Sequence, residues 1–99
     1  MPDAGFEWDP DKAISNLADH AVSFDEAATV FGDPFAITVA DPDHSWDEER
    51  WWTIGLSLRE RLVVIWHTDR GDSVRLIGAR LASPAERRKY ESEQQGRDA

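Results

Sequence analysis

Cysteine is absent from the 99 residues, and no apolar run approaches the ~20 residues that a membrane-spanning helix needs. Without thiols, the chain has neither a disulfide framework nor a thiolate metal site. The first residues, Met-Pro-Asp-Ala-Gly, lack the basic and apolar regions of a signal peptide. We therefore expect one cytoplasmic domain at residues 1–91, with no membrane contact, and a flexible tail at residues 92–99.

Basic residues are scarce in the first half of the chain. Residues 1–49 hold 13 acids and one base, whereas residues 50–99 hold 7 acids and 10 bases, so the net charge of -9 combines -12 with +3. Acids can simply keep a small domain soluble, but that role does not explain their segregation. A polyanion has to approach the second half, and a basic protein could meet the first.

The first expected helix begins at Asp9 and Pro10, because aspartate caps helix N-termini and proline suits the first helical position. The helix is expected to end near Ala21. Its apolar residues recur at helical spacing and lie on one face: Ile14, Leu17 and Ala18.

Two further helices are marked by the spacing of a capping box, in which a serine and a glutamate three residues later cap each other's backbone. Ser23 and Glu26 predict the second helix, and Gly32 is expected to end it in a left-handed conformation. Ser83 and Glu86 predict the third helix near the end of the chain.

Strands are indicated by alternating or continuous apolar runs. Phe6–Trp8 is a candidate edge strand, and residues 41–49 form a polar loop. The pattern predicts an α+β domain with two N-terminal helices, an antiparallel sheet of about four strands and a C-terminal helix. The expected strands are residues 35–40, 50–58, 62–66 and 73–82.

The last strand carries two arginines, Arg75 and Arg80, among apolar neighbours. A charge in such a strand costs free energy unless it is paired or faces a groove. Alternation puts the two arginines on opposite faces unless a bulge intervenes. We expect Arg80, beside the small Gly78, to face a cleft.

Several short motifs are common singly but specific in this order and spacing over residues 6–91. They are Phe6–Asp9, Lys12, Asn16, His20, Val22–Ala27, Val30–Pro34, Glu48–Arg50, Gly55–Ser57, Arg75–Arg80, Glu86–Arg87 and Tyr90. Together they resemble the BrnT family of type II toxins, small ribonucleases with a fold similar to RelE. The resemblance implies a cytoplasmic toxin that cleaves RNA, blocks translation and uses neither metal nor cofactor.

The same resemblance implies a protein partner. It would be an antitoxin of the BrnA type with a ribbon-helix-helix DNA-binding part, and the complex would bind operator DNA only through the antitoxin. The alternative reading is a catalytically degenerate protein-interaction module of the same fold, which the acidic first half favours.

RNA cleavage without a metal needs a base for the 2′-hydroxyl, an acid for the leaving oxygen and cations for the phosphorane. His20 can transfer a proton near neutral pH, Glu49 could act as a base, and Tyr90 could stack on a base or pass a proton. Arg80 completes the candidate catalytic set, as the arginine that most needs a partner or a ligand.

Further cations are candidate RNA-binding residues, since guanidinium groups bind phosphate oxygens bidentately. They are Lys12, Arg50 and Arg75. Each candidate also has a structural explanation. His20 could interact with a helix end, and Glu49 with Arg50 could form a weak surface ion pair. We interpret His67 as a structural residue, and Trp51 and Trp66 as core or interface residues rather than base-stacking platforms.

Overall fold

The computed structural model describes residues 5–41 and 49–98, so residues 42–48 of the expected polar loop lie outside it. Its helices and strands follow one another without long insertions. Their order is β1 (Phe6–Glu7), α1 (Pro10–His20), α2 (Phe24–Thr29), the 3-10 turn η1 (Val30–Gly32), β2 (Ile37–Ala40), β3 (Arg50–Leu56), β4 (Leu62–Arg70), β5 (Ser73–Leu81) and α3 (Pro84–Asp98).

The strands of the described residues form a single sheet in the order β1-β5-β4-β3-β2. From β2 to β5 each neighbouring pair is antiparallel, whereas β1 runs parallel to β5. The α+β prediction is confirmed. The expected four strands become five because the two-residue β1 joins the sheet edge, where it pairs Phe6 with Val74 and Glu7 with Arg75.

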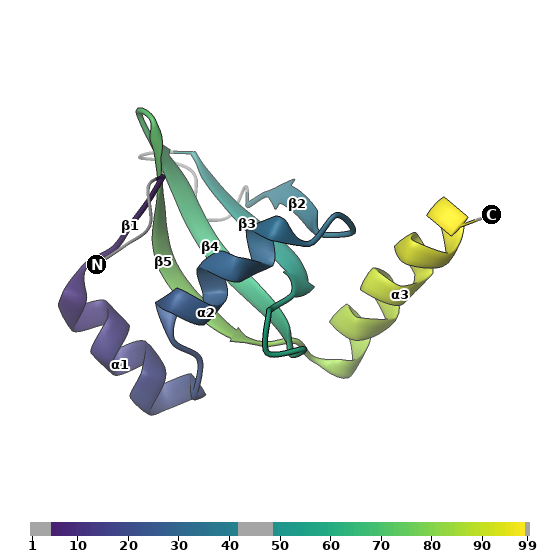
Figure 1. Cartoon of the computed structure of the whole chain (residues 1–99), viewed down its shortest axis with the longest axis horizontal. Coiled ribbons are helices and arrows are strands. Elements are labelled where there is room, and N and C mark those ends of the chain that lie inside the picture. Colours follow the sequence, from purple (N-terminus) through teal and green to yellow (C-terminus); the bar gives the residue numbers. More distant parts are fainter. Residues whose placement is uncertain (1–4, 42–48, 99) are drawn as a thin grey trace.

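The two faces of the sheet are covered differently. Helices α1 and α2 pack over one face, where Phe24, Val30 and Ile65 lie in one apolar core. On the other face Tyr90 of α3 joins a second core with Ile54. Figure 1 shows α2 crossing the sheet, α1 beside β5 at the edge of the sheet, and α3 at one end of it. No helix in the described part of the chain is both long and apolar enough to cross a bilayer.

Helix α1 has its predicted bounds but turns its apolar face outward. Ile14 is 70% exposed and Leu17 53% exposed. The inward side is anchored by the buried Asn16, whose amide donates to the carbonyls of Val22 and Ala79 at 2.9 and 2.8 Å. Its Oδ1 also accepts from the Ala79 N–H at 3.0 Å. Beyond the end of β1, the Asn16 side chain thus satisfies the edge of β5 as a neighbouring strand would.

Helix α2 starts as predicted, but two details of the prediction are wrong. The Ser23 hydroxyl accepts from the Glu26 N–H at 3.0 Å, as in a capping box. The Glu26 carboxylate, however, turns away from the cap and binds Arg61 and Ser57 of the β3–β4 connection. Gly32 does not adopt a left-handed conformation, because the chain continues from α2 into η1 before it leaves the helix.

Strand β5 contains a bulge that reverses the expected arrangement of its arginines. Leu76 pairs with His67 and Gly78 with Trp66, so Ile77 is an extra residue without a partner. On either side of the bulge, Arg75 pairs with Thr68 and Arg80 with Val64, and alternation along β4 puts these partners on one face. The two arginines therefore share a face of the sheet, and the prediction of opposite faces is wrong.

Helix α3 begins with the predicted reciprocal cap. The Ser83 N–H donates to the Glu86 carboxylate at 2.8 Å, and the Glu86 N–H donates to the Ser83 hydroxyl at 3.2 Å. The helix extends to Asp98 and includes most of the residues predicted to form a tail. Glu86 is thereby fixed beside the end of β5.

Candidate functional site

Three arginines lie on the sheet face that α1 and α2 leave open. Cross-strand pairing places Arg75, Thr68 and Arg50 in one row, and Trp66 and Trp52 in the next. Arg80 follows one row further, opposite Val64. Along β4 the rows of Arg75 and Arg80 are four residues apart, about 13 Å. We call the set Arg50, Arg75, Arg80, Trp52 and Trp66 the arginine face.

Arg80 is held by a carboxylate and an aromatic ring. Its Nη1 and Nη2 donate to the two Glu86 oxygens at 2.8 and 2.9 Å, and its Cζ lies 5.1 Å from the centre of the Trp66 ring. The hydrogen bond to Glu86 raises the pKa of Arg80, and the same contact lowers the pKa of Glu86 to about 2. The group remains a full cation in a fixed orientation.

Arg50 and Trp66 line a shallow pocket of about 280 Å³ on the same face. The bulged Ile77 and Gly78 complete its lining. The pocket thus lies between the Arg75–Arg50 row and Arg80, and its chemistry combines an indole, an aliphatic side chain and a guanidinium. Trp66 also packs, half-buried, against the core of Ile54 and Tyr90, which agrees with its interpretation as a core or interface residue.

The row of Arg75, Thr68 and Arg50 on the arginine face is stabilised by two polar contacts. Arg75 donates to the Glu7 carboxylate at 2.9 Å, which joins β5 to β1. The Thr68 hydroxyl donates to the Glu49 carbonyl at 2.7 Å and thereby fixes the backbone next to Arg50. Glu49 itself is exposed and directly precedes Arg50, the first residue of β3.

Lys12 and His20 lie on α1 and are exposed. This helix packs its Ala13 into the core on the opposite face and binds the edge of β5 through Asn16. The predicted site residues are therefore divided: Arg50, Arg75 and Arg80 come together on one face, whereas Lys12 and His20 belong to the helix layer.

Tyr90 has a different environment from the one predicted for a group that meets RNA. It is only 6% exposed, and its hydroxyl donates to Asp33 Oδ2 at 2.6 Å. The same oxygen of Asp33 accepts from the Leu56 N–H at 2.8 Å, and Asp33 Oδ1 accepts from the Phe35 N–H at 2.9 Å. Tyr90 thus connects α3 to the segment between η1 and β2.

His67 is buried under the helix layer, which agrees with its interpretation as a structural residue. Its Nε2 lies 2.7 Å from the Thr53 hydroxyl, which in turn lies 2.7 Å from the Thr38 hydroxyl. The Phe31 ring meets the imidazole edge-on at 5.0 Å, and Nδ1 is buried without a hydrogen-bond partner. Burial lowers the pKa of His67 to about 4, so the ring is neutral near pH 7.

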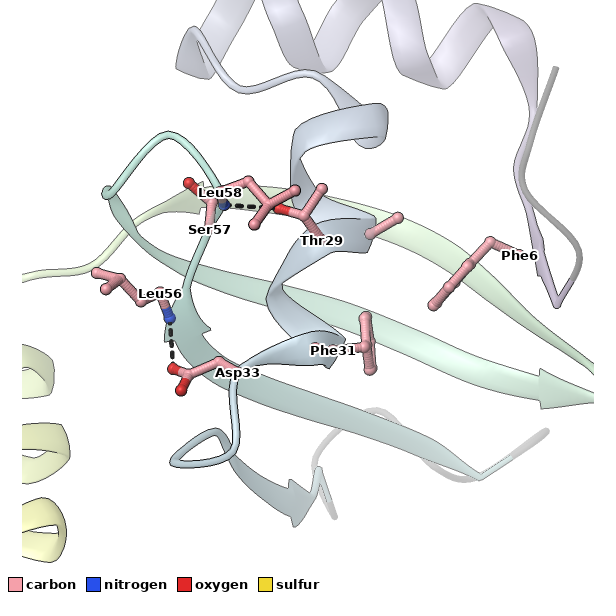
Figure 2. Close-up of a pocket in the computed structure, with 9 residues that line it drawn as sticks. Phe6, Thr29, Phe31, Asp33, Leu56, Ser57 and Leu58 are labelled. Atoms are coloured by element: carbon pink, nitrogen blue, oxygen red, sulfur yellow. Dashed lines mark hydrogen bonds between the residues drawn. The ribbon is translucent and has the colours of Figure 1, made fainter.

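A larger groove, of about 560 Å³, lies on the helix side of the sheet between η1 and the β3–β4 connection. Figure 2 shows Leu58 and Thr29 on either side of a hydrogen bond, with Phe31 and Phe6 further along the groove. Among its lining residues one is charged, Asp33, and that charge is negative. The groove therefore suits an apolar group rather than a polyanion, and the arginine face is the better candidate site.

Across residues 5–41 and 49–98, no three His, Asp or Glu side chains are grouped so that they could hold a metal ion. Chemistry on the arginine face rests on its guanidinium groups, which bind oxyanions by charge and by paired N–H donors.

The fold and this face define a small α+β domain with a cationic sheet surface, and comparisons assign it to a family. The family model for the ribonuclease toxin BrnT of type II toxin-antitoxin systems matches residues 8–86, and the chain belongs to this family. The crystal structure of the Brucella abortus ribonuclease toxin BrnT is similar to it, with a TM-score of 0.58 and 21% identity. The match covers 79% of this chain and 95% of that one, and it supports the fold alone. No curated protein sequence matches the chain.

Proposed function

We propose that this chain is an endoribonuclease that cleaves RNA without a metal ion and thereby inhibits translation. Membership of a ribonuclease toxin family supports this activity. The observation that carries the proposal is the bulge in β5, which gathers Arg75 and Arg80 on the face that also holds Arg50. Three cations on one face suit a phosphodiester, whose negative charge increases as the phosphorane forms.

In the proposed reaction the 2′-oxygen attacks phosphorus, its proton passes to a base, and the leaving 5′-oxygen takes a proton as its bond breaks. The arginine face holds the phosphate oxygens. Glu49, next to Arg50, is the proposed base. His20 lies in the helix layer, away from the arginine face, so the proton for the leaving oxygen is proposed to come from solvent. Tyr90 acts through the position of α3, because its hydroxyl donates to Asp33.

Glu86 limits the access of phosphate to Arg80. Its carboxylate occupies both terminal nitrogens of the guanidinium at 2.8 and 2.9 Å. A phosphate that binds Arg80 bidentately has to displace this carboxylate, whereas Arg50 and Arg75 approach from the other side of Trp66. Arg75 also has an acidic partner, Glu7, so RNA has to compete with a carboxylate at both Arg75 and Arg80.

The toxin-antitoxin family implies an antitoxin partner. We propose that it is a BrnA-like protein of the ribbon-helix-helix type that neutralises the toxin in the cytoplasm and carries the complex to operator DNA. The acidic first half of the chain, with 13 acids against one base in residues 1–49, would meet basic residues of such a partner.

Induced expression and incubation of the purified chain with RNA test the proposal. We expect growth arrest and RNA cleavage, and at least a hundredfold slower cleavage for Arg80→Gln, since a lost transition-state hydrogen bond has that magnitude. Arg88→Gln, on an exposed position of α3, is the matched control. His20→Ala, in the helix layer, is expected to retain cleavage, and a loss of cleavage in the folded variant would return His20 to the candidate catalytic set.

Normal growth and intact RNA with the folded wild-type chain would contradict the ribonuclease proposal. That outcome would favour the alternative, a catalytically inactive interaction module of the same fold. Full activity of a folded Arg80→Gln variant would remove Arg80 from the mechanism but leave the family assignment intact.

A further inference from the structure

The pocket beside Trp66 exists because of the bulge in β5. Ile77, the residue without a partner on β4, lines the pocket, and the next residue, Gly78, has no side chain to fill it. Trp66 and Arg50 form the rest of the lining around about 280 Å³. The result is a shallow hollow with an indole ring, an aliphatic wall and one guanidinium.

Trp66 belongs both to this pocket and to the surroundings of Arg80. Its ring centre lies 5.1 Å from the Arg80 Cζ, and the cation–π contact with the Glu86-bound guanidinium fixes the ring. An aromatic ring in a fixed orientation is a low-entropy platform for a second flat ring. The distance also means that a group in the pocket lies close to a cation that can bind phosphate.

We propose that this pocket binds a nucleobase of single-stranded RNA, which stacks on Trp66 while an adjoining phosphate meets the arginines. The proposal rests on the proposed function and adds a base subsite to it. A flat ring suits the indole and Ile77. A double helix stacks its bases internally, so the pocket selects single strands.

An apolar side chain from a protein could also enter a hollow of this size. The charges of the arginine face favour the nucleotide, because Arg50, Arg75 and Arg80 share the face with the pocket and every nucleotide carries a phosphate. The groove on the helix side offers an apolar lining without cations and is the better place for an apolar side chain.

Binding of two probes to the full chain tests the base subsite without cleavage. One probe is a short single-stranded 2′-O-methyl oligoribonucleotide, which lacks the attacking hydroxyl, and the other is an abasic oligomer of the same length and charge. We expect Trp66→Leu to weaken binding of the first by roughly 5- to 150-fold, the loss of one stacked base, and to leave the second unchanged. Trp66→Phe should restore most of the affinity.

Trp51→Leu is the matched control, because Trp51 pairs with His67 and its side chain lies on the opposite face from Trp66. We expect this variant to bind both probes like the wild type. An equal loss for both probes in Trp66→Leu would show that the ring acts only by holding Arg80, and would overturn the base subsite. Unchanged binding of both probes, or loss of antitoxin binding alone, would overturn it as well.

The two proposals fail separately. Absence of RNA cleavage and growth arrest would contradict the ribonuclease function, whereas Trp66-dependent binding of the base-containing probe by such an inactive chain would leave the subsite standing. If the wild type cleaves RNA and the Trp66→Leu variant cleaves it equally well, the ribonuclease function stands and the base subsite is overturned.

Discussion

At the scale of single residues, Asn16 stabilises the fold more than the apolar residues of its helix. It contributes three hydrogen bonds to the backbone of Val22 and Ala79, all buried. We expect Asn16→Ala to lower the free energy of unfolding by about 2–4 kcal/mol, because the substitution leaves buried backbone groups without hydrogen-bond partners. Urea unfolding measures the change.

The matched variant is Ile14→Ser on the outward side of the same helix. Because Ile14 is 70% exposed, we expect its substitution to change stability by about 0.5 kcal/mol or less. A larger effect for Ile14→Ser than for Asn16→Ala would contradict this orientation of α1.

His67 makes stability depend on pH. The folded chain holds this imidazole neutral down to about pH 4, whereas its ordinary pKa is 6.5. Between those values the unfolded chain binds more protons, so the contribution is complete above pH 6.5 and is lost as the pH falls towards 4. The loss amounts to about 3 kcal/mol.

Unfolding curves at pH 7 and 4.5 for the wild type and His67→Gln measure this effect. The carboxylates titrate in both proteins and cancel in the difference. We expect the variant to have the flatter profile, and parallel profiles would show that His67 does not contribute.

The starts of the three helices could be predicted from sequence because capping is local. Asp9, Ser23 and Ser83 each bond to an N–H two or three residues away. The outward turn of Ile14 could not be predicted, since it depends on where Asn16 meets a strand 63 residues later. The carboxylate of Glu26 binds Arg61 rather than its own cap for the same reason.

At the scale of elements, α3 is attached to the sheet at two points. Tyr90 donates to Asp33, and Glu86 binds Arg80. Substitution of Tyr90, the first attachment, can distinguish a structural role of this residue from a catalytic one. We expect Tyr90→Phe to lower the free energy of unfolding by about 1–2 kcal/mol, since a hydrogen bond to a carboxylate is lost. RNA cleavage should be retained at temperatures where the variant is folded.

Circular dichroism melts and cleavage rates on the same Tyr90→Phe preparation provide the measurement. An unchanged melting temperature together with abolished cleavage would instead return Tyr90 to the catalytic group. Tyr90→Leu serves as a second variant, because it also removes the ring from the core with Ile54 and should be less stable than Tyr90→Phe.

The arginine face could be predicted from sequence only in part. The identity of its cations was evident, because Arg75 and Arg80 stand among apolar residues. Their common face was not, since alternation alone gives the opposite result and the bulge appears only when β5 pairs with β4. The pocket beside Trp66 could not be predicted either, because its lining includes the bulged Ile77.

At the scale of the whole molecule, the three arginines lie on one side of the sheet and several exposed acids lie on the other. The helix layer carries exposed acids such as Asp11, Asp19 and Asp25, whereas the open face carries the arginines. RNA binding should therefore be directional and sensitive to salt. With three phosphate contacts we expect log Kobs to fall against log salt with a slope of about −2.

Titration of a single-stranded oligomer at several salt concentrations measures the slope. Arg75→Gln should reduce its magnitude by about 0.7, the share of one phosphate contact. Arg88→Gln, on the exposed surface of α3, should leave the slope unchanged. A wild-type slope near zero would show that the arginine face does not bind phosphate.

The bulge also sets a rule for counting residues. On a straight strand two side chains share a face only when an even number separates their positions, yet Arg75 and Arg80 are five apart and share one. A related chain without the extra residue would need its arginines four residues apart to present the same surface. Transfer of this pair to an unbulged scaffold would likewise require the removal of one intervening residue, or the second guanidinium would emerge among the helices.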